Sequence, residues 1–274
     1  ERFRRNGYRV FGAGRLMDGR EREAWGRDEV GGDFGPFPAR EDLLANHGDR
    51  YWGVTPWSGP DSDFLDTVNT DAAIEFIGRE HEKPFFLALG LFRPHPPFTA
   101  PARFFERYDT DSLELPPGYR EGDRYDLPPA AHRMSSARSN RWLNSGKSRK
   151  PEWKRILHGY LAATSFADWN VGRVLEALES GPHAGDTIVV FWSDNGFHVG
   201  EKNHFGKGTP WRNSVRTPAA VRLPGNVQNG RGVRQPVSAV DFFATLVDYC
   251  SLGPAGQTGD GLSLRPLLEK PDMR

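Results

Sequence analysis

The sequence has little of three things that would direct its chemistry or its location. It contains one cysteine, Cys250, which excludes an internal disulfide and a metal site built from several cysteines. Its longest apolar stretch, residues 85–92, is too short to cross a bilayer, so no membrane span is expected. Lysine plus arginine and aspartate plus glutamate both number 36, so no net charge favours binding to nucleic acid. Any anion site must therefore be local.

The chain begins with Glu1 rather than methionine, and residues 2–5 have the composition of a helix interior. We therefore expect the natural start of the protein to lie upstream. With 274 residues the chain is long enough for one large α/β domain or two small ones, and one domain is the simpler prediction. If the upstream part carries a signal peptide, the protein is periplasmic or secreted.

Apolar residues at helical spacing are followed twice by a short continuous apolar run. The first predicted helix precedes the run at residues 85–89, and the second, longer one precedes the run at residues 188–192. Lys83-Pro84 and Gly181-Pro182 separate each helix from its run. The positions that define the helices are Leu65, Val68, Ala72 and Phe76 in the first, and Ile156, Tyr160, Ala163, Ala167, Val171, Val174 and Leu178 in the second. This order predicts helices that lead into buried strands.

A third apolar run, at residues 219–221, lies between two prolines, and a last helix follows it. Helices that alternate with buried strands predict an α/β sandwich. Two stretches, residues 20–59 and 116–151, are rich in glycine, proline and polar residues without sustained periodicity, and we expect long surface excursions there that could face a substrate. The apolar face of the last helix consists of Val240, Phe243, Leu246, Val247 and Cys250.

Polar residues follow the second predicted strand, at residues 193–198. In open α/β sheets, ligands gather beyond the carboxyl ends of the strands, where loops converge. Here Asp194 and Asn195 place a carboxylate and an amide oxygen side by side, and calcium and magnesium prefer such donors. Aspartate, asparagine and glycine also form ordinary tight turns, and without other evidence the turn is the better interpretation.

Two further segments carry positive charge on a rigid or glycine-rich backbone. Residues 201–208 place cations and imidazole beside glycines that allow close approach of an anion. After the first predicted strand, Arg93 and His95 lie on a backbone stiffened by three prolines, which suits a preorganised oxyanion site. Taken alone, the first segment could be a solvated loop, His95 a packed core histidine and Arg93 half of a surface ion pair.

Together these segments resemble the sulfatases of the alkaline phosphatase superfamily, and among them the iduronate-2-sulfatase-like group. The resemblance covers nearly the whole chain and implies an alkaline phosphatase-like α/β fold, with a mixed, mostly parallel sheet sandwiched by helices and incomplete at the N-terminus. Residues 1–274 would then be the middle and C-terminal part of one catalytic domain. The matching segments are Leu-Phe-Arg-Pro-His-Pro-Pro-Phe at 91–98, Ser-Asp-Asn-Gly-Phe-His-Val-Gly-Glu-Lys at 193–202, Phe-Gly-Lys at 205–207, Arg-Thr-Pro at 216–218, Val-Asp-Phe-Phe-Ala-Thr-Leu at 240–246 and Asp-Gly-Leu-Ser-Leu-Arg-Pro-Leu-Leu at 260–268.

The resemblance also implies roles for single residues. Lys207 and His95 correspond to the lysine and histidine that hold the sulfate oxygens and assist the leaving group. Arg93 and His198 are expected to bind sulfate. Arg93 stands where lysine is more usual, and this change keeps the positive charge.

Two other parts of the expected site are only partly present. Asp194 and Asn195 resemble half of a divalent metal site, usually calcium, whose other carboxylates belong to an early strand absent from this sequence. Residues 11–19 resemble a segment in which sulfatases carry Gly-Lys, two intervening residues and often His. Arg15, which replaces the lysine, can still bind sulfate, whereas an ionised Asp18 in place of the histidine would repel it.

Sulfatases use a cysteine or serine in a Cys-x-Pro-Ser-Arg-like motif, matured to formylglycine, and the sequence contains no such motif. Cys250 continues an apolar helix face, which favours a packed core thiol. We therefore expect the formylglycine in a missing N-terminal segment and expect this chain alone to be inactive. Poor independent stability is also expected, because a sheet that lacks strands exposes edges and apolar faces.

The function implied by the resemblance is sulfuric ester hydrolysis, with sulfated carbohydrates favoured over other sulfated small molecules by analogy within the group. A phosphoester or phosphonate hydrolase of the same superfamily is an alternative, since the same metal and anion apparatus serves phosphorus. A non-catalytic anion- or glycan-binding homologue is another, indicated by Asp18 and the absent nucleophile.

Overall fold

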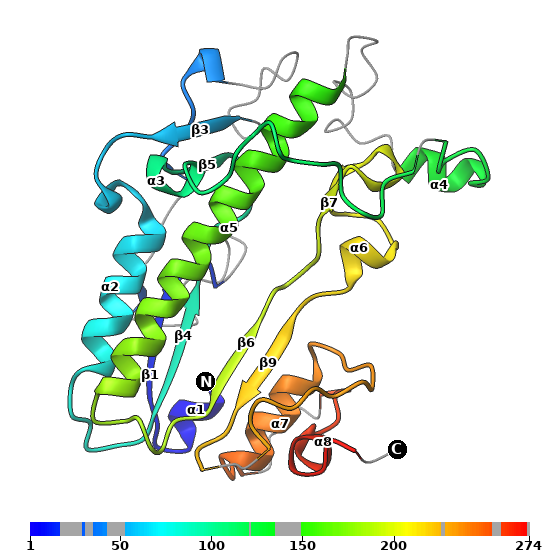
Figure 1. Ribbon diagram of the computed structural model, residues 1–274. Coiled ribbons are helices and arrows are strands. Elements are labelled where there is room, and N and C mark those ends of the chain that lie inside the picture. Colours follow the sequence, from blue (N-terminus) through cyan, green and yellow to red (C-terminus); the bar gives the residue numbers. More distant parts are fainter. Residues whose placement is uncertain are drawn as a thin grey trace.

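A computed structural model describes residues 1–16, 29–30, 35–42, 53–120, 122–134, 149–225, 228–253 and 259–272 (Figure 1). A three-stranded parallel sheet has the order β2-β1-β4. β1 (Arg9–Gly14) pairs with β4 (Phe85–Gly90) along its whole length, and β2 (Glu29–Val30) pairs with the other side of β1. β4 confirms the first predicted strand. Because β1 and β4 are parallel and in register, they end at the same edge of the sheet.

One helix packs against this sheet, and a second, longer helix packs against the first (Figure 1). α2 (Leu65–Ile77) contacts β1 and β4, and α5 (Arg149–Ser180) lies along α2. Glycines follow both helices, at Gly78 and Gly181, and such residues favour helix ends. Both helices confirm the prediction from apolar spacing.

The buried face of α2 only partly matches the face that its apolar residues predict: Phe76 is buried as expected. Val68, part of the predicted face, is exposed. The cause is that polar side chains of α2 turn inward, where Asp66 accepts hydrogen bonds from buried backbone groups. The buried residues of the helix are Asp66, Thr67, Asn69, Thr70, Ala73, Phe76 and Ile77.

The main hydrophobic core lies between α5, α3 (Ala102–Phe105) and the parallel pair of β3 (Val54–Trp57) and β5 (Phe98–Pro101). α5 approaches these strands closely at Gly159, where a Cβ would lie 2.7 Å from Val54 Cγ1. Burying a large apolar side chain in such a core stabilises the fold by about 1.5–3 kcal/mol. The fully buried apolar side chains include Phe64, Phe98, Phe104, Ile156, Phe166 and Phe205.

The C-terminal part of the chain is built on an antiparallel pair of strands, β6 and β9. A small hairpin of β7 and β8 is inserted between them. β6 and β9 confirm the second and third predicted strands, and α7 confirms the last predicted helix. In chain order the elements are β6 (Val189–Trp192), β7 (His198–Val199), the 3₁₀ turn η6 (Glu201–Asn203), β8 (Phe205–Gly206), α6 (Arg212–Val215), β9 (Ala219–Arg222), α7 (Asp241–Tyr249) and α8 (Arg265–Glu269).

Short elements occupy parts of the two stretches expected to be surface excursions. β3 lies within residues 20–59, where Val54 is buried against the core. In residues 116–151, the described part includes a short helix, α4 (Pro129–Met134), and the start of α5. The remaining short helices are α1 (Arg2–Arg5), η3 (Arg40–Asp42) and η4 (Asp61–Asp63).

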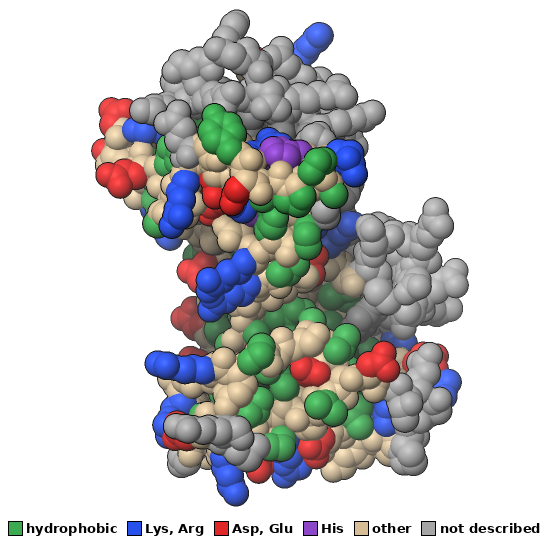
Figure 2. All heavy atoms as spheres, turned by 90° about the vertical axis from the view of Figure 1, so that its right-hand side faces the viewer, with side chains coloured by type: hydrophobic (Ala, Val, Ile, Leu, Met, Phe, Trp, Pro, Cys, Tyr) green, Lys and Arg blue, Asp and Glu red, His purple; other side chains and the backbone are tan. Residues whose placement is uncertain are grey.

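Several apolar residues that the sequence predicts to be buried are exposed. Phe191 and Trp192 of β6 are 45% and 47% exposed, and all six residues of β4 are only partly buried. In the described part of the chain, β4 and β6 are edge strands of separate sheets, which explains the incomplete cover. Figure 2 shows apolar side chains on the surface of the lower half of the molecule, the half that holds α7 and α8 in Figure 1. Poor stability of the chain alone stays a prediction.

Three of the five strand pairs among the described residues are parallel, and helices pack beside them. The predicted fold class, an α/β arrangement of mixed, mostly parallel strands with helices, is therefore confirmed. Across the ranges that the structure describes, none of the helices combines the length and apolar character needed to span a bilayer.

Candidate functional site

Two glycines bring the ends of β1 and β4 together. Gly14 has a φ of +84°, and a Cβ on it would lie 2.1 Å from the carbonyl oxygen of Gly90. A Cβ on Gly90 would lie 2.1 Å from the carbonyl oxygen of Arg15. The N–H of Arg15 donates to the carbonyl oxygen of Gly90 at 2.7 Å. The absence of side chains at both glycines thus places Arg15 beside the loop that follows β4.

His95 lies in that loop, where three cations act on it. Its Nδ1 is 2.7 Å from the carbonyl oxygen of Pro96, so the neutral ring donates from Nδ1 and its basic nitrogen is Nε2. Burial lowers the pKa of His95 below its usual value; the bond to Pro96 opposes this, and the charges of Lys207, Arg15 and Arg93 lower the pKa further. The three cations come from segments after β8, β1 and β4, so the fold brings four predicted site residues together.

Lys207 also reaches the predicted metal ligands. Its Nζ donates to Oδ1 of Asn195 at 2.8 Å. The side-chain Nδ2 of Asn195 donates to the carbonyl oxygen of Gly196 at 2.8 Å. The hydroxyl of Ser193 donates to the backbone carbonyl oxygen of Asn195, also at 2.8 Å. Asp194 is exposed beside them at the end of β6. The anion-binding and metal-binding predictions therefore meet in one place.

Asp194 and Asn195 offer two oxygen donors of the kind that calcium prefers. Calcium takes about six to eight oxygens, and no group of three or more His, Cys, Asp or Glu side chains suited to a metal occurs in the described ranges. The two residues therefore fit as part of a coordination sphere. One of the two donors, Asn195 Oδ1, already accepts a hydrogen bond from Lys207.

Arg93 carries its charge from inside the protein. It is 3% exposed, and its Nε donates to the carbonyl oxygen of Thr99 at 2.8 Å. Its guanidinium carbon lies 5.0 Å from the ring centre of Phe92. Burial lowers the pKa of Arg93 to about 10, with the charge of Asp66 opposing the shift, so Arg93 is positive at neutral pH. Direct contact between Arg93 and sulfate stays a prediction.

His198 belongs to β7 and lies in a buried cluster of polar side chains. It is 1% exposed, its Nε2 is 3.4 Å from Thr209 Oγ1, and its ring centre is 5.1 Å from that of His204. Burial, followed by the charge of His204, lowers the pKa of His198 to about 4, so the ring is neutral at pH 7. His198 is not among the charges that shift His95. Its contact with sulfate stays a prediction, and such contact would require the cluster to open.

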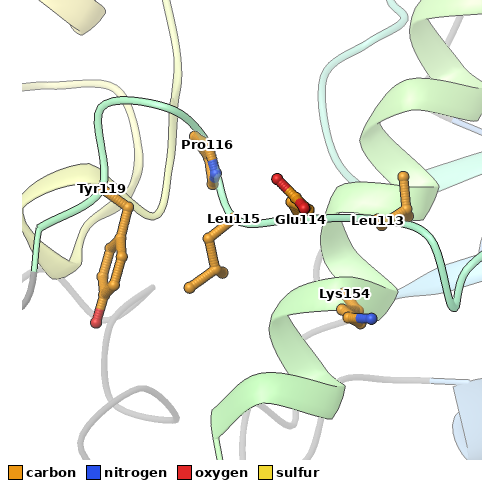
Figure 3. A pocket seen from close by; sticks show the side chains of 6 residues that line it. All are labelled: Leu113, Glu114, Leu115, Pro116, Tyr119 and Lys154. Carbon is orange, nitrogen blue, oxygen red and sulfur yellow. The ribbon is translucent and has the colours of Figure 1, made fainter.

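A shallow groove of about 370 Å³ lies where residues 113–119 pass the N-terminal half of α5 (Figure 3). Lys154 reaches it from α5, and Tyr119 comes from the opposite wall. None of the predicted site residues lines it. The same wall contacts the β7–β8 hairpin region, since a Cβ on Gly118 would lie 3.2 Å from Glu201 Cγ. The remaining lining residues are Leu113, Glu114, Leu115 and Pro116.

The sequence profile of the sulfatase family matches residues 2–252. The chain belongs to the sulfatase family. A sulfatase of Formosa agariphila is 36% identical over 98% of this chain and 55% of its own length. Human iduronate 2-sulfatase is 28% identical over 61% of this chain and 32% of its own length, which agrees with the predicted resemblance to that group. The chain thus spans about half the length, or less, of the curated sulfatases it matches.

Solved structures agree with a sulfatase-type fold. The phosphonate monoester hydrolase of Silicibacter pomeroyi has a TM-score of 0.67 at 26% identity, covering 80% of this chain and 47% of its own. A protein solved with its substrate D-glucosamine-2-N,6-O-disulfate has a TM-score of 0.66 at 20% identity, covering 98% of this chain and 63% of its own. The alkaline phosphatase-like fold of this sulfatase-family chain is thereby confirmed.

Asp18 and Asp66 are two further residues of interest in this sulfatase-family chain. Asp18 lies outside the described residues. Asp66, which binds the backbone after β4, escaped the sequence analysis because an acidic residue in the first helical turn is usually a solvated partner of the helix dipole. A search for polar residues at helical spacing would have found it, since Asp66, Asn69, Thr70 and Ala73 share one buried face.

Proposed function

We propose that the protein to which this chain belongs hydrolyses sulfate esters, and that its substrates are sulfated carbohydrates. The observation that supports this most is the convergence of Arg15, Arg93 and Lys207 on His95. Three positive charges around one imidazole, supplied by separate segments, suit an anionic group with several oxygens. The substrate class follows the family and the sulfated glucosamine bound by a protein of similar fold.

In this proposal Lys207 and His95 act on the sulfate group directly. The ammonium of Lys207 holds a sulfate oxygen and stabilises charge that develops on the leaving oxygen. The lowered pKa of His95 makes its protonated form a stronger acid than free histidine, which favours proton transfer from Nε2 to the leaving alcohol. Arg15 binds a sulfate oxygen. The buried Arg93 adds a positive charge that attracts the sulfate.

A divalent metal, calcium by family resemblance, is proposed to bind Asp194 and Asn195 together with ligands from outside the described residues. Bound there, the metal would offset negative charge on the sulfate, while a formylglycine would supply the nucleophilic oxygen. The 274 residues contain no Cys-x-Pro-Ser-Arg-like motif. We therefore propose that this chain alone binds sulfate esters and does not turn them over.

A phosphonate or phosphoester hydrolase is the second candidate function. The similarity in fold to the Silicibacter pomeroyi enzyme favours it, and the same cations would hold a phosphonate as well as a sulfate. A non-catalytic glycan-binding homologue is the third candidate, because Asp18 stands where sulfatases often carry histidine.

The deciding experiment begins with the coding sequence upstream of Glu1, followed by expression of the whole protein. Release of sulfate from D-glucosamine-2-N,6-O-disulfate is compared with hydrolysis of p-nitrophenyl phenylphosphonate. Faster turnover of the sulfated sugar, with a Cys- or Ser-x-Pro/Ala-Ser-Arg motif upstream, supports the proposal. Preference for the phosphonate supports the second candidate, and binding without turnover of either compound supports the third.

A further inference from the structure

Asp66 holds two consecutive backbone amides immediately after β4. It lies in the first turn of α2 and is 5% exposed. Its Oδ1 accepts the N–H of Phe92 at 2.6 Å, and its Oδ2 accepts the N–H of Arg93 at 3.0 Å. One buried side chain therefore fixes the first peptides of the loop that carries His95.

The geometry suits an ionised carboxylate. Both oxygens of Asp66 accept from N–H donors, and a protonated carboxyl group would turn a hydrogen toward one of them. Burial raises the pKa of Asp66 above its usual value, and the charge of Arg93 and the two amides only partly oppose this shift. The N-terminus of α2 adds a favourable partial charge. The carboxylate therefore has local partners for its charge despite burial.

The same peptide is tied directly to His95. The N–H of His95 donates to the carbonyl oxygen of Phe92 at 3.0 Å, and the two ring centres are 4.8 Å apart. Phe92 is thus held at its N–H by Asp66 and at its carbonyl by His95. A shift of the Phe92 peptide would move the imidazole relative to Arg15 and Lys207.

We propose that Asp66 is a positioning residue for the anion site, which acts by fixing the Phe92 and Arg93 peptides and thereby the place of His95. The inference rests on the proposed function, since it assumes that His95 meets a sulfate group. Asp66 itself does not contact the anion.

An electrostatic role and a positioning role of Asp66 predict opposite changes in sulfate affinity when the carboxylate is removed. Asp66→Asn takes a negative charge away from a site that binds an anion, so a purely electrostatic role predicts tighter sulfate binding. It also replaces one acceptor with an N–H₂ group facing an N–H donor, so a positioning role predicts weaker binding. The sign of the change therefore separates the two roles.

The experiment uses the whole protein to which this chain belongs, with inorganic sulfate as the probe. Sulfate affinity is measured by calorimetry for the wild type, Asp66→Asn and Asp71→Asn. Asp71 is the matched control because it is exposed on the same helix and pairs with Arg173. We expect sulfate affinity to fall about tenfold in Asp66→Asn, as loss of a buried charge-assisted hydrogen bond predicts, and to be unchanged in Asp71→Asn.

Two further measurements test whether Asp66 positions His95. The His95 ring signals, assigned in ¹⁵N spectra with His95→Gln, should shift in Asp66→Asn and not in Asp71→Asn. Asp66→Glu, which keeps the charge and displaces the carboxylate, should also weaken binding and serves if Asp66→Asn fails to fold. Unchanged or tighter sulfate binding with unmoved His95 signals would overturn the inference. If the wild type binds no sulfate, the proposed function fails, and the His95 signals alone then decide whether Asp66 positions the ring.

Discussion

The Nζ of Lys207 and the Oδ1 of Asn195 are 2.8 Å apart, so a predicted sulfate-binding lysine and a predicted metal ligand share a hydrogen bond. The bond joins the end of β6 to the segment after β8. It makes the metal and anion halves of the site interdependent, because a divalent cation on Asn195 would lie close to the ammonium of Lys207.

Removal of the Lys207 charge should therefore tighten calcium binding. At about 4 Å in water, a single charge repels a divalent ion by about 2 kcal/mol, so Lys207→Met should raise calcium affinity by about tenfold or more. Calorimetry with Lys270→Met, which alters an exposed lysine after α8, provides the control. Equal calcium affinity in wild type and Lys207→Met would show that the metal does not use Asn195.

The buried ring of His198 should make stability depend on pH in a defined window. The unfolded state takes up the proton near pH 6.5, whereas the folded state does so only near pH 4. Between these values the unfolded state binds more protons, so the free energy of unfolding falls as pH falls, by about 3 kcal/mol in all. Above pH 6.5 this stability is fully present.

Denaturant unfolding at pH 7 and pH 4 checks this in wild type and His198→Gln, which can keep the contact with Thr209. The wild type should lose about 3 kcal/mol more than the variant over this range. Identical pH dependence in the two proteins would mean that the folded state protonates His198 as readily as the unfolded state does.

The close approach of β1 and β4 should depend on Gly14. A methyl group there would meet the carbonyl oxygen of Gly90 at 2.1 Å on a backbone with a φ of +84°, so Gly14→Ala should destabilise the fold by about 3 kcal/mol or more. Gly172→Ala is the control, since a Cβ there meets no atom within 4 Å and α5 should gain about 0.5–1 kcal/mol. Thermal unfolding that ranks the two variants in the other order would contradict the packing described.

The sequence predicts secondary structure well where short-range patterns along the chain determine it. Helical spacing and glycine or proline breaks were sufficient to predict α2, α5 and β4. Burial was less predictable, because it depends on what packs against each face. Trp192 lies in an apolar run and is 47% exposed, since β6 is an edge strand in the described part of the chain.

The candidate site was predictable to a similar degree. Loops that converge beyond strand ends place Arg93 and Lys207 where the charges of both act on His95. Their roles in a sulfate site stay a prediction. The depth of Arg93 and the role of Asp66 depend on the packing of α2, which no local pattern encodes.

If the cations around His95 bind a sulfate ester, the whole protein, with its upstream nucleophile replaced by alanine, should distinguish D-glucosamine-2-N,6-O-disulfate from unsulfated D-glucosamine in a binding measurement. We predict binding of the sulfated sugar only, at least about tenfold weaker in Lys207→Ala and unchanged in Lys270→Ala. Affinity should rise as pH falls below 6.5 toward the lowered pKa of His95, because protonation adds a positive charge. Equal affinity for the two sugars, or full affinity in Lys207→Ala, would contradict this account of the site.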